Sequence, residues 1–347
     1  MKGKFTFRVH GNNSFYEFEL KRNITMLQGD SGTGKTTLLE ILLQYLRNGE
    51  ASGYSVETDA NYYVFMHEPT QGTWHDELDN LRNTVIFIEE NNQFVMNRSF
   101  ASFVKASGNY FVIINRASIK CLLYSTKEMY ELESELSEDG YTQIYHFKEI
   151  YPKELNVFSK TDLFDFKLDL VITEDSNTGF RFFKNFFNVN VDTAGGNSKI
   201  LQVVGDFNKS NLLCIADGAA YGAYMQQLYE YINSKFIGQI VLWIPESFEY
   251  LLLKAKVIDF DGLNEILENT YNFVECSKFS SWERFFTSLA IENSSKEHKY
   301  KKNSEDDYYC NNEGTRIKIR KVLPMNLQKF SIPKNKNSEQ TTKMSLF

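Results

Sequence analysis

The sequence contains few of the residues that mark several protein classes. Its 347 residues include only 5 Pro, 19 Gly and 4 Cys. So little Pro and Gly excludes a collagen-like or linker-rich chain, and dispersed cysteines without a Cys-x-x-Cys pair exclude a disulfide-dense or zinc-finger domain. No apolar run approaches the length of a membrane-spanning helix. The first residues, MKGKFTFRVHGNN, hold no apolar signal region, which predicts a cytoplasmic protein with reduced thiols.

The residues that are abundant indicate large hydrophobic cores and an uneven charge. Hydrophobic residues make up 42% of the chain and aromatic residues 15%, and a chain of this length is expected to form two domains. The net charge of −7 divides into +6 for residues 296–347 and −13 for the remainder. An acidic body with a basic end suits an end that meets an anion. The alternative is a solvated, weakly ordered tail.

The N-terminal residues alternate apolar and polar side chains. KFTFRVH (4–10) and FYEFEL (15–20) are separated by the turn-like Gly11-Asn12-Asn13, which predicts an antiparallel hairpin. The short apolar strand Ile24–Leu27 follows. We expect the first domain to span residues 1–155 and the second residues 165–325, with a disordered tail over 331–347.

A glycine-rich loop lies between that strand and an amphipathic helix that ends near Asn48-Gly49. The pattern Gly29-x-x-x-x-Gly34-Lys35-Thr36 is a P-loop in its required context. Backbone N–H groups of such a loop surround a phosphate, the lysine reaches the β- and γ-phosphates, and the threonine hydroxyl meets Mg²⁺. We therefore predict ATP and Mg²⁺ as ligands. The predicted nucleotide-binding residues are Gly29, Asp30, Ser31, Gly32, Thr33, Gly34, Lys35, Thr36 and Thr37.

Two further strands end in polar residues suited to a P-loop ATPase. Val85–Ile88 precedes Glu89-Glu90 and resembles a Walker B segment with Glu in place of Asp. We expect Glu89 to hold the metal and Glu90 to orient the attacking water; a solvated acidic turn is the alternative. NYFVIINRAS ends in Asn115-Arg116. Arg116 is expected to sense the γ-phosphate, in cis or in a neighbouring subunit, or else to pair with a neighbouring glutamate at the surface.

The second half alternates strands and helices. This order predicts a mostly parallel, doubly wound sheet, and an α/β fold for the whole chain. In such sheets the functional residues lie at the carboxyl ends of the strands. The residues at those ends are Glu174-Asp175, Gly195-Gly196-Asn197, Asp217 and Glu246.

Four segments of this half together resemble a Toprim domain: ITEDSNTGFRFF, VDTAGGNSKI, CIADGAAYGAY and IPESFEYLL. They place a Glu after the first strand, a Gly-Gly turn after the second and Asp-x-x-x-x-Gly after the third. A P-loop ATPase followed by a Toprim domain is similar to the OLD (overcoming lysogenization defect) family of nucleases. The resemblance spans about residues 25–345 but is carried by short stretches. It implies Mg²⁺-dependent phosphodiester chemistry, in phage defence or on a mobile element.

By that resemblance Glu174 takes the Toprim Glu and Asp217 the first Asp, both as catalytic metal ligands. The second Asp falls on Ala219, and a further acidic position of the family falls on Thr178. Without the resemblance, Asp217 reads equally well as the N-cap of the following helix. Magnesium prefers several oxygen ligands. The acidic residues left for a reduced site are Glu174, Asp175, Asp217 and either Glu246 or Glu249.

The sequence pattern of the C-terminal region predicts a helix, then a loop and then a basic strand. Phe279–Ala290 has helical periodicity, and residues 295–312 are polar and expected to form a loop. Thr315–Leu323 alternates basic and apolar residues. As a strand, it would present a wholly basic face, which would suit a phosphate backbone; the alternative is a strand face that is simply solvated.

Three functions remain open at this point. The first is an ATP-dependent nuclease. The second is an ATPase switch whose Toprim-like half has lost catalysis and binds a partner. The third, a nucleotide kinase, is disfavoured because no Arg-rich lid follows the P-loop. The absence of an LSGGQ-like segment disfavours a transporter ATPase. We expect nucleic acid or a protein as partner, a homo-oligomer, and no membrane association.

Overall fold

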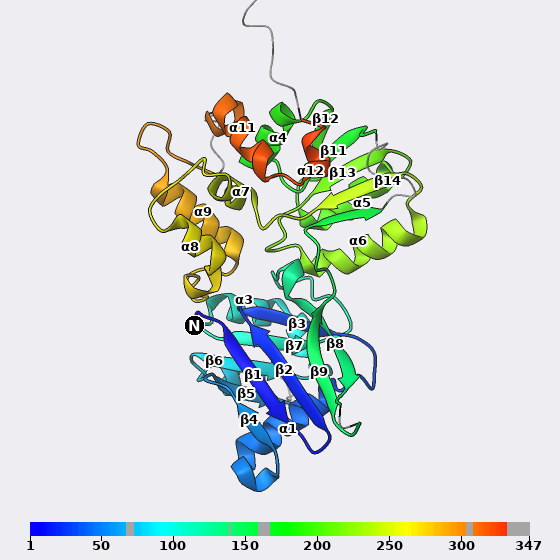
Figure 1. Ribbon diagram of the computed structural model, residues 1–347, viewed down its shortest axis with the longest axis vertical. Helices are drawn as coiled ribbons and strands as arrows, with labels where there is room; N and C mark the ends of the chain where they lie inside the picture. Colours follow the sequence, from blue (N-terminus) through cyan, green and yellow to red (C-terminus); the bar gives the residue numbers. More distant parts are fainter. Residues whose placement is uncertain (67–72, 139, 159–166, 303–307, 332–347) are drawn as a thin grey trace, which may run out of the picture.

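The computed structural model describes residues 1–66, 73–138, 140–158, 167–302 and 308–331. These residues form a mixed α/β fold built on two sheets, one of nine strands and one of five. Figure 1 shows the first sheet below and the second above, with the helices from α8 onward beside and over the second. The predicted disordered tail lies almost wholly outside the described residues. None of the helices in these ranges is both long and apolar enough to cross a membrane.

The larger sheet combines a parallel core with antiparallel N-terminal strands. Its strands, in spatial order, are β4 (Ser55–Glu57), β1 (Phe5–His10), β2 (Ser14–Leu20), β9 (Gln143–Glu149), β8 (Met129–Leu136), β3 (Ile24–Gln28), β7 (Tyr110–Ile114), β6 (Thr84–Ile88) and β5 (Asn61–Phe65). The predicted β1–β2 hairpin is present. The sequence interpretation missed β4, β5 and the antiparallel β8–β9 pair.

Both faces of the parallel core are buried, as its near-continuous apolar strands require. On β6 and β7, Val85, Phe87 and Val112 pack toward α1 (Lys35–Asn48). The alternate residues pack toward α3 (Arg98–Ala106) on the other face. The remaining helical segments of this half are η1 (Gly49–Ser52), α2 (Thr73–Leu78), η2 (Gln93–Met96) and η3 (Thr126–Glu128).

The smaller sheet is the predicted mostly parallel one. Its order is β10 (Leu155–Phe158), β14 (Gln239–Trp243), β13 (Asn211–Ile215), β11 (Leu170–Thr173) and β12 (Asn190–Thr193). Only β10 runs antiparallel to its neighbour. In chain order, β9 is the last strand of the first sheet and β10 is the first strand of the second. The chain therefore passes from one sheet to the other between residues 149 and 155.

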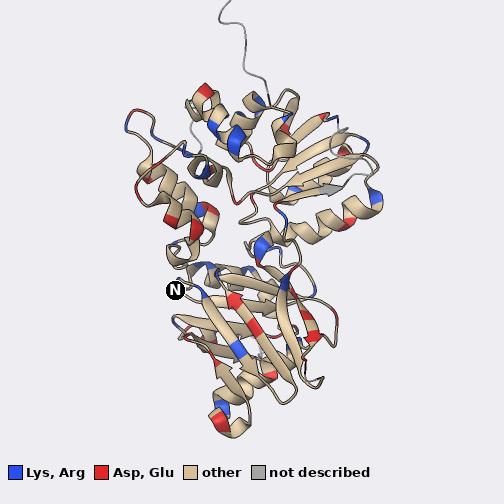
Figure 2. Ribbon diagram, in the orientation of Figure 1, with Lys and Arg blue, Asp and Glu red and all other residues tan. Residues whose placement is uncertain are grey.

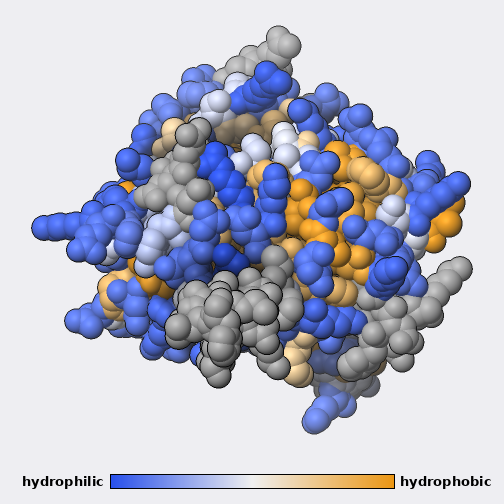
Figure 3. Space-filling view, turned by 90° about the horizontal axis from the view of Figure 1, so that it is seen from above, coloured by the Kyte–Doolittle hydropathy of each residue, from blue (hydrophilic) through white to orange (hydrophobic). Residues whose placement is uncertain are grey.

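Helices cover both faces of the smaller sheet. On one face lie η4 (Asn197–Lys199), α5 (Ile200–Asp206) and α6 (Gly222–Lys235). The other face and the C-terminal region carry α4 (Thr178–Phe186), α7 (Phe248–Lys254), α8 (Leu263–Glu268), η5 (Thr270–Asn272), α9 (Trp282–Asn293), α10 (Tyr308–Asn311), α11 (Glu313–Val322) and α12 (Met325–Gln328). Seen from above, the surface is mainly hydrophilic, with the largest apolar area to the right of the centre and smaller ones elsewhere (Figure 3).

One apolar cluster joins the two sheets. It contains Met26 and Ile113 from the first sheet and Ile172 and Leu242 from the second, together with side chains of α3 and α6. The two halves are therefore packed against each other through a shared core.

The predicted basic strand at Thr315–Leu323 is wrong, because these residues form helix α11. The side chain of Asn312 accepts a hydrogen bond from the backbone N–H of Thr315 and caps the helix. Thr315, Ile319 and Leu323 recur every four residues and are buried. A wholly basic face does not form, and Figure 2 shows basic residues scattered over both halves among acidic ones. The predicted loop over 295–312 likewise contains the short helix α10.

Candidate functional site

The loop between β3 and α1 has the backbone of a phosphate cradle. Gly29, Gly32 and Gly34 adopt φ angles of +115°, +82° and +96°, which only glycine takes without strain. Lys35 folds back over the loop. Its Nζ donates hydrogen bonds to three loop oxygens, the carbonyls of Gly29 (2.9 Å) and Asp30 (2.6 Å) and the hydroxyl of Thr33 (2.8 Å). The ammonium group therefore sits at the centre of the loop.

Two tyrosines set the position of Gly34 from behind. Tyr16 on β2 donates a hydrogen bond to the Gly34 carbonyl at 3.1 Å, and its ring stacks on Tyr145 of β9. A Cβ on Gly34 would lie 2.8 Å from Cε1 of Tyr145. Position 34 must be glycine for steric reasons as well as for its backbone conformation.

Polar residues from two neighbouring strands meet this loop. Because β7 lies between β3 and β6, Arg116 after β7 stands between the loop and the acidic end of β6. Its guanidinium donates to Ser31 Oγ at 2.6 Å and pairs with Glu90 at 2.5 Å. Partial burial lowers the pKa of Lys35, and the negative charge of Glu90 opposes that shift. Of the two roles considered for Arg116, the structure contains the ion pair with Glu90.

The remaining predicted nucleotide- and metal-site residues lie at the start of α1 and after β6. Thr36 and Thr37 are exposed in the first turn of α1, and Glu89 directly follows β6, where its N–H bonds to the Phe65 carbonyl. An exposed hydroxyl and a carboxylate at this edge are oxygen donors of the type that Mg²⁺ uses beside a nucleotide. Thr36 and Glu89 were predicted to hold the ion, and their oxygens are of the type that could do so.

A second acidic site lies at the carboxyl ends of β11 and β13, where Glu174 and Asp217 meet. The Asp217 backbone N–H donates to Glu174 Oε2 at 2.8 Å. Burial raises the pKa of Glu174 to about 8 and the pKa of Asp217 well above its usual range; the negative charge of Glu283 adds to both shifts, and that of Glu174 adds to the shift at Asp217. Asp217 does not cap α6, since that helix begins five residues later, at Gly222.

Residues of the C-terminal half surround this acid pair. Glu249, at the start of α7, accepts a hydrogen bond of 2.8 Å from the Tyr300 hydroxyl. Lys302 lies 3.9 Å from Glu249 and forms an ion pair with Glu283 of α9. Glu249 Oε2 is buried without a hydrogen-bond partner among the described residues. The cavity that Glu174, Asp217, Glu249, Tyr300 and Lys302 line measures about 30 Å³, which is room for one or two waters or a single small ion.

Ala219 and Thr178 stand where the Toprim pattern has acidic residues, and neither contributes a carboxylate to this site. Ala219 is buried and its N–H bonds to the Glu246 carbonyl. The Thr178 hydroxyl donates to the Lys302 carbonyl at 2.5 Å. Within the described ranges, no three acidic, His or Cys side chains converge as a metal site would require. Glu174 and Asp217 alone would have to hold a metal, with solvent completing the oxygen set.

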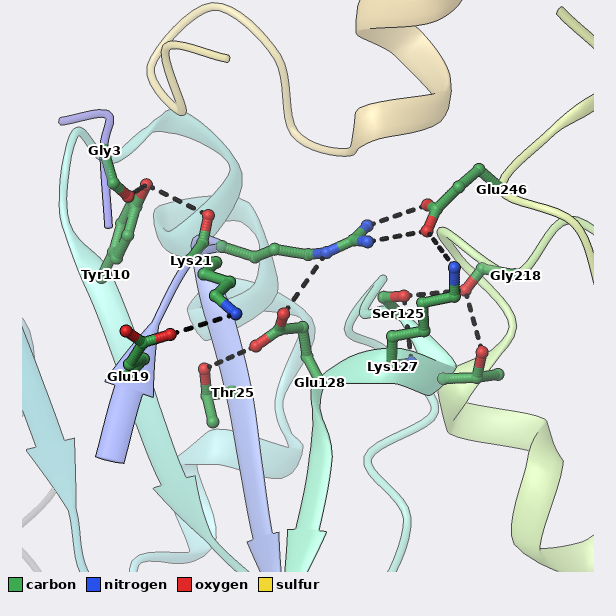
Figure 4. Close-up of polar contacts among 12 residues, drawn as sticks. Gly3, Glu19, Lys21, Thr25, Tyr110, Ser125, Lys127, Glu128, Gly218 and Glu246 are labelled. Carbon is green, nitrogen blue, oxygen red and sulfur yellow. Dashed lines mark hydrogen bonds and ion pairs between the residues drawn. The ribbon is translucent and has the colours of Figure 1, made fainter. Parts of the chain in front are cut away.

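The expectation that Glu246 joins the acidic site is wrong, because this carboxylate points toward the first sheet. Arg22, just before β3, donates two hydrogen bonds to Glu246, of 3.0 and 2.8 Å. Glu128 lies 3.4 Å from the same guanidinium, and Lys127 lies 3.2 Å from Glu246 (Figure 4). All but Lys127 are buried. These four residues are called the Arg22 network below.

The Arg22 network joins elements from distant parts of the chain. The Arg22 guanidinium lies 3.5 Å from the ring centroid of Trp282 at the start of α9, a favourable cation–π geometry. At Glu246 burial opposes ionisation, but the charges and hydrogen bonds of Arg22 and Lys127 outweigh it and lower the pKa to about 2. At Glu128 burial outweighs the arginine and raises the pKa to about 7. The ends of β3 thus carry the Gly29–Thr37 loop on one side and this contact with the second half on the other.

Sequence reasoning missed the Arg22 network and the trio Glu283, Tyr300 and Lys302. No local pattern marks them, since each contact spans a long sequence separation. Comparison of the chain with family models, with curated proteins and with solved structures gave no match.

Proposed function

We propose that this chain is a P-loop ATPase whose nucleotide state acts on a Toprim-like second half. The observation that carries the proposal is the assembly around the loop: Lys35 at its centre, and Arg116 bonded both to Ser31 of the loop and to Glu90. A loop, a lysine, an acid and an arginine brought together in this way match the parts needed for phosphoryl transfer.

Each residue has a role in that chemistry. The N–H groups of Gly32 and Gly34 and the start of α1 favour a bound anion, and Lys35 supplies a positive charge to the β- and γ-phosphates. Glu90 orients and deprotonates the attacking water, and Arg116 offsets the charge that develops in the transition state. Mg²⁺, when bound at Thr36 and Glu89, neutralises phosphate charge.

The test is nucleotide binding and hydrolysis by the full chain. Lys35→Ala should lower the affinity for a fluorescent ATP analogue and abolish ATP turnover. Lys235→Ala, which removes an exposed lysine at the end of α6, is the matched control and should match wild type in both assays. An unchanged affinity and turnover in Lys35→Ala would refute the proposal.

Communication between the halves is supported by the position of β3. One end of this five-residue strand leads into the loop, and Arg22 lies just before the other. A ligand changes the conformation of the second half only if it binds two conformations of the protein with different affinity. Addition of an ATP analogue should therefore change hydrogen exchange over residues 244–250 in wild type, and should not change it in Lys35→Ala.

A second candidate function is metal-dependent phosphodiester cleavage by the second half. It is supported by the meeting of Glu174 and Asp217, whose pKa values are raised mainly by burial and further by neighbouring carboxylates, so that a bound cation would favour their ionised forms. Supercoiled plasmid, ATP and Mg²⁺ or Mn²⁺ form the assay. Nicking that is lost in Glu174→Ala and in Asp217→Ala supports a nuclease. ATP turnover without nicking supports a switch whose second half serves as a binding module.

A further inference from the structure

A cavity of about 410 Å³ lies where the two halves join, away from both sites described above. It opens between α3 and the segment 121–123, next to Asn23 just before β3 and Ser280 before α9. The Gly29–Thr37 loop follows the other end of β3. The volume falls within the usual range of small-molecule sites, about 300–1,000 Å³.

The wall of the cavity is apolar with one unsatisfied polar group. Ile24, Val104 and Leu122 line it and are buried in the shared core. Ser280 is only 8% exposed, and its hydroxyl has no hydrogen-bond partner among the described residues. A buried hydroxyl without a partner costs free energy, and a ligand with a polar atom at this place would remove that cost.

The rim of the cavity carries positive charge that no acid neutralises. Arg98 and Lys105 lie seven residues apart on α3, so they share one face of the helix. Both are exposed, neither forms an ion pair within the described residues, and no acidic residue lines the cavity. The pair would attract an anionic group placed at the rim.

We propose that this cavity binds a small amphipathic anion, with an aromatic or aliphatic body against Ile24, Val104 and Leu122 and a carboxylate or phosphate at Arg98 and Lys105. Burial of the apolar body against this wall favours binding, and the two cations favour an anionic ligand over a neutral one. The proposal does not depend on ATP binding at the loop.

Cys121 provides a direct readout, because it lines the cavity and is half-buried while Cys214, Cys276 and Cys310 are buried. The folded full chain is alkylated with N-ethylmaleimide and followed by intact-mass spectrometry. Indole-3-acetate and octanoate serve as anionic probes, and their neutral amides as controls. Millimolar acid should slow alkylation of Cys121, and the matching amide should slow it much less. If neither acid slows the alkylation of Cys121, the proposal is overturned.

Two variants test the charge and the space separately. Arg98→Gln with Lys105→Gln should weaken protection by the acids about tenfold without affecting the amides. Ser102→Trp, from an exposed lining position on α3, should fill the cavity and abolish the response to the probes. Lys235→Gln is the control and should behave as wild type. Wild-type protection in either the double variant or the Trp variant would overturn the proposal, provided that urea unfolding confirms a folded protein.

Discussion

Arg22 and Glu246, 224 positions apart in the chain, are joined by two hydrogen bonds of 3.0 and 2.8 Å. Both side chains are buried. Arg22 lies just before β3 of the first sheet, and Glu246 follows β14 of the second sheet. A bidentate pair of this kind fixes orientation as well as distance. The contact therefore holds the two halves in one arrangement.

The first prediction concerns the stability of this pair. Arg22→Met leaves Glu246 buried without its main partner, and such a change costs about 3–5 kcal/mol in the free energy of unfolding. Urea denaturation of the full chain measures the loss. Arg8→Ala, which breaks an exposed ion pair with Glu17, is the control and should leave the midpoint unchanged.

The combined change Arg22→Met with Glu246→Leu separates a lost attraction from an uncompensated charge. Removing both charges together should destabilise the protein less than Arg22→Met alone, since the desolvation cost of both ions disappears as well. A double variant that is as unstable as the sum of the single variants would contradict this account of the pair.

The second prediction concerns Gly34. Gly34→Ala should abolish nucleotide binding, because the new Cβ would lie 2.8 Å from the Tyr145 ring at a φ of +96° and would displace the loop. Gly53→Ala is the matched control, since it has a φ of +76° and open space around it. The control should lose about 1 kcal/mol of stability and keep its affinity for an ATP analogue. Retained affinity in Gly34→Ala would contradict the steric argument.

The third prediction separates binding from hydrolysis at Arg116. This side chain lies over Ser31 and Glu90, so Arg116→Ala should lower the rate of ATP hydrolysis about a hundredfold while nucleotide affinity changes little. Arg116→Lys keeps the positive charge but lacks the planar guanidinium that contacts Ser31 and Glu90 together. It should recover only part of the rate. Steady-state turnover and equilibrium binding give the two quantities. Equal losses in affinity and rate would place Arg116 in binding alone.

The fourth prediction concerns pH. Burial raises the pKa of Glu174 from 4.5 to about 8, so in the folded protein this group keeps its proton where the unfolded chain releases it. Its contribution to stability is complete below about pH 4.5 and is lost as the pH rises toward about 8. Unfolding midpoints measured across this range should therefore fall with rising pH.

The variant Glu174→Gln tests the origin of that fall. Gln cannot lose a proton, and it retains an oxygen to accept the Asp217 N–H, so the decline in midpoint should become shallower. Glu297→Gln, at an exposed position, should keep the wild-type slope. An unchanged slope in Glu174→Gln would show that other groups control the pH dependence.

Sequence reasoning was strongest where the signals are local. The first hairpin, the glycine loop, α1 and the alternation of the second half follow from periodicity and turn residues that adjoin in the chain. The β8–β9 pair was missed although β8 alternates Glu131, Glu133 and Glu135 with other residues, a pattern that predicts a half-exposed strand.

Where two periodicities fit the same residues, the sequence was misread. RIKIRK alternates as a strand does, yet Thr315, Ile319 and Leu323 also fit a helix, and the cap at Asn312 decides for the helix. Glu246 was misplaced for another reason. Its role depends on Arg22, which has no local pattern that relates it to the end of a strand more than 200 residues away.

The apolar cluster shared by the two sheets limits how this protein can be divided. A cut between residues 149 and 155 would separate the sheets but would leave Met26 and Ile113 on one fragment, and Ile172 and Leu242 on the other, without their common packing. Each fragment would expose to water a face that the whole chain buries. Isolated halves should therefore aggregate, and any activity of either sheet has to be measured in the complete chain.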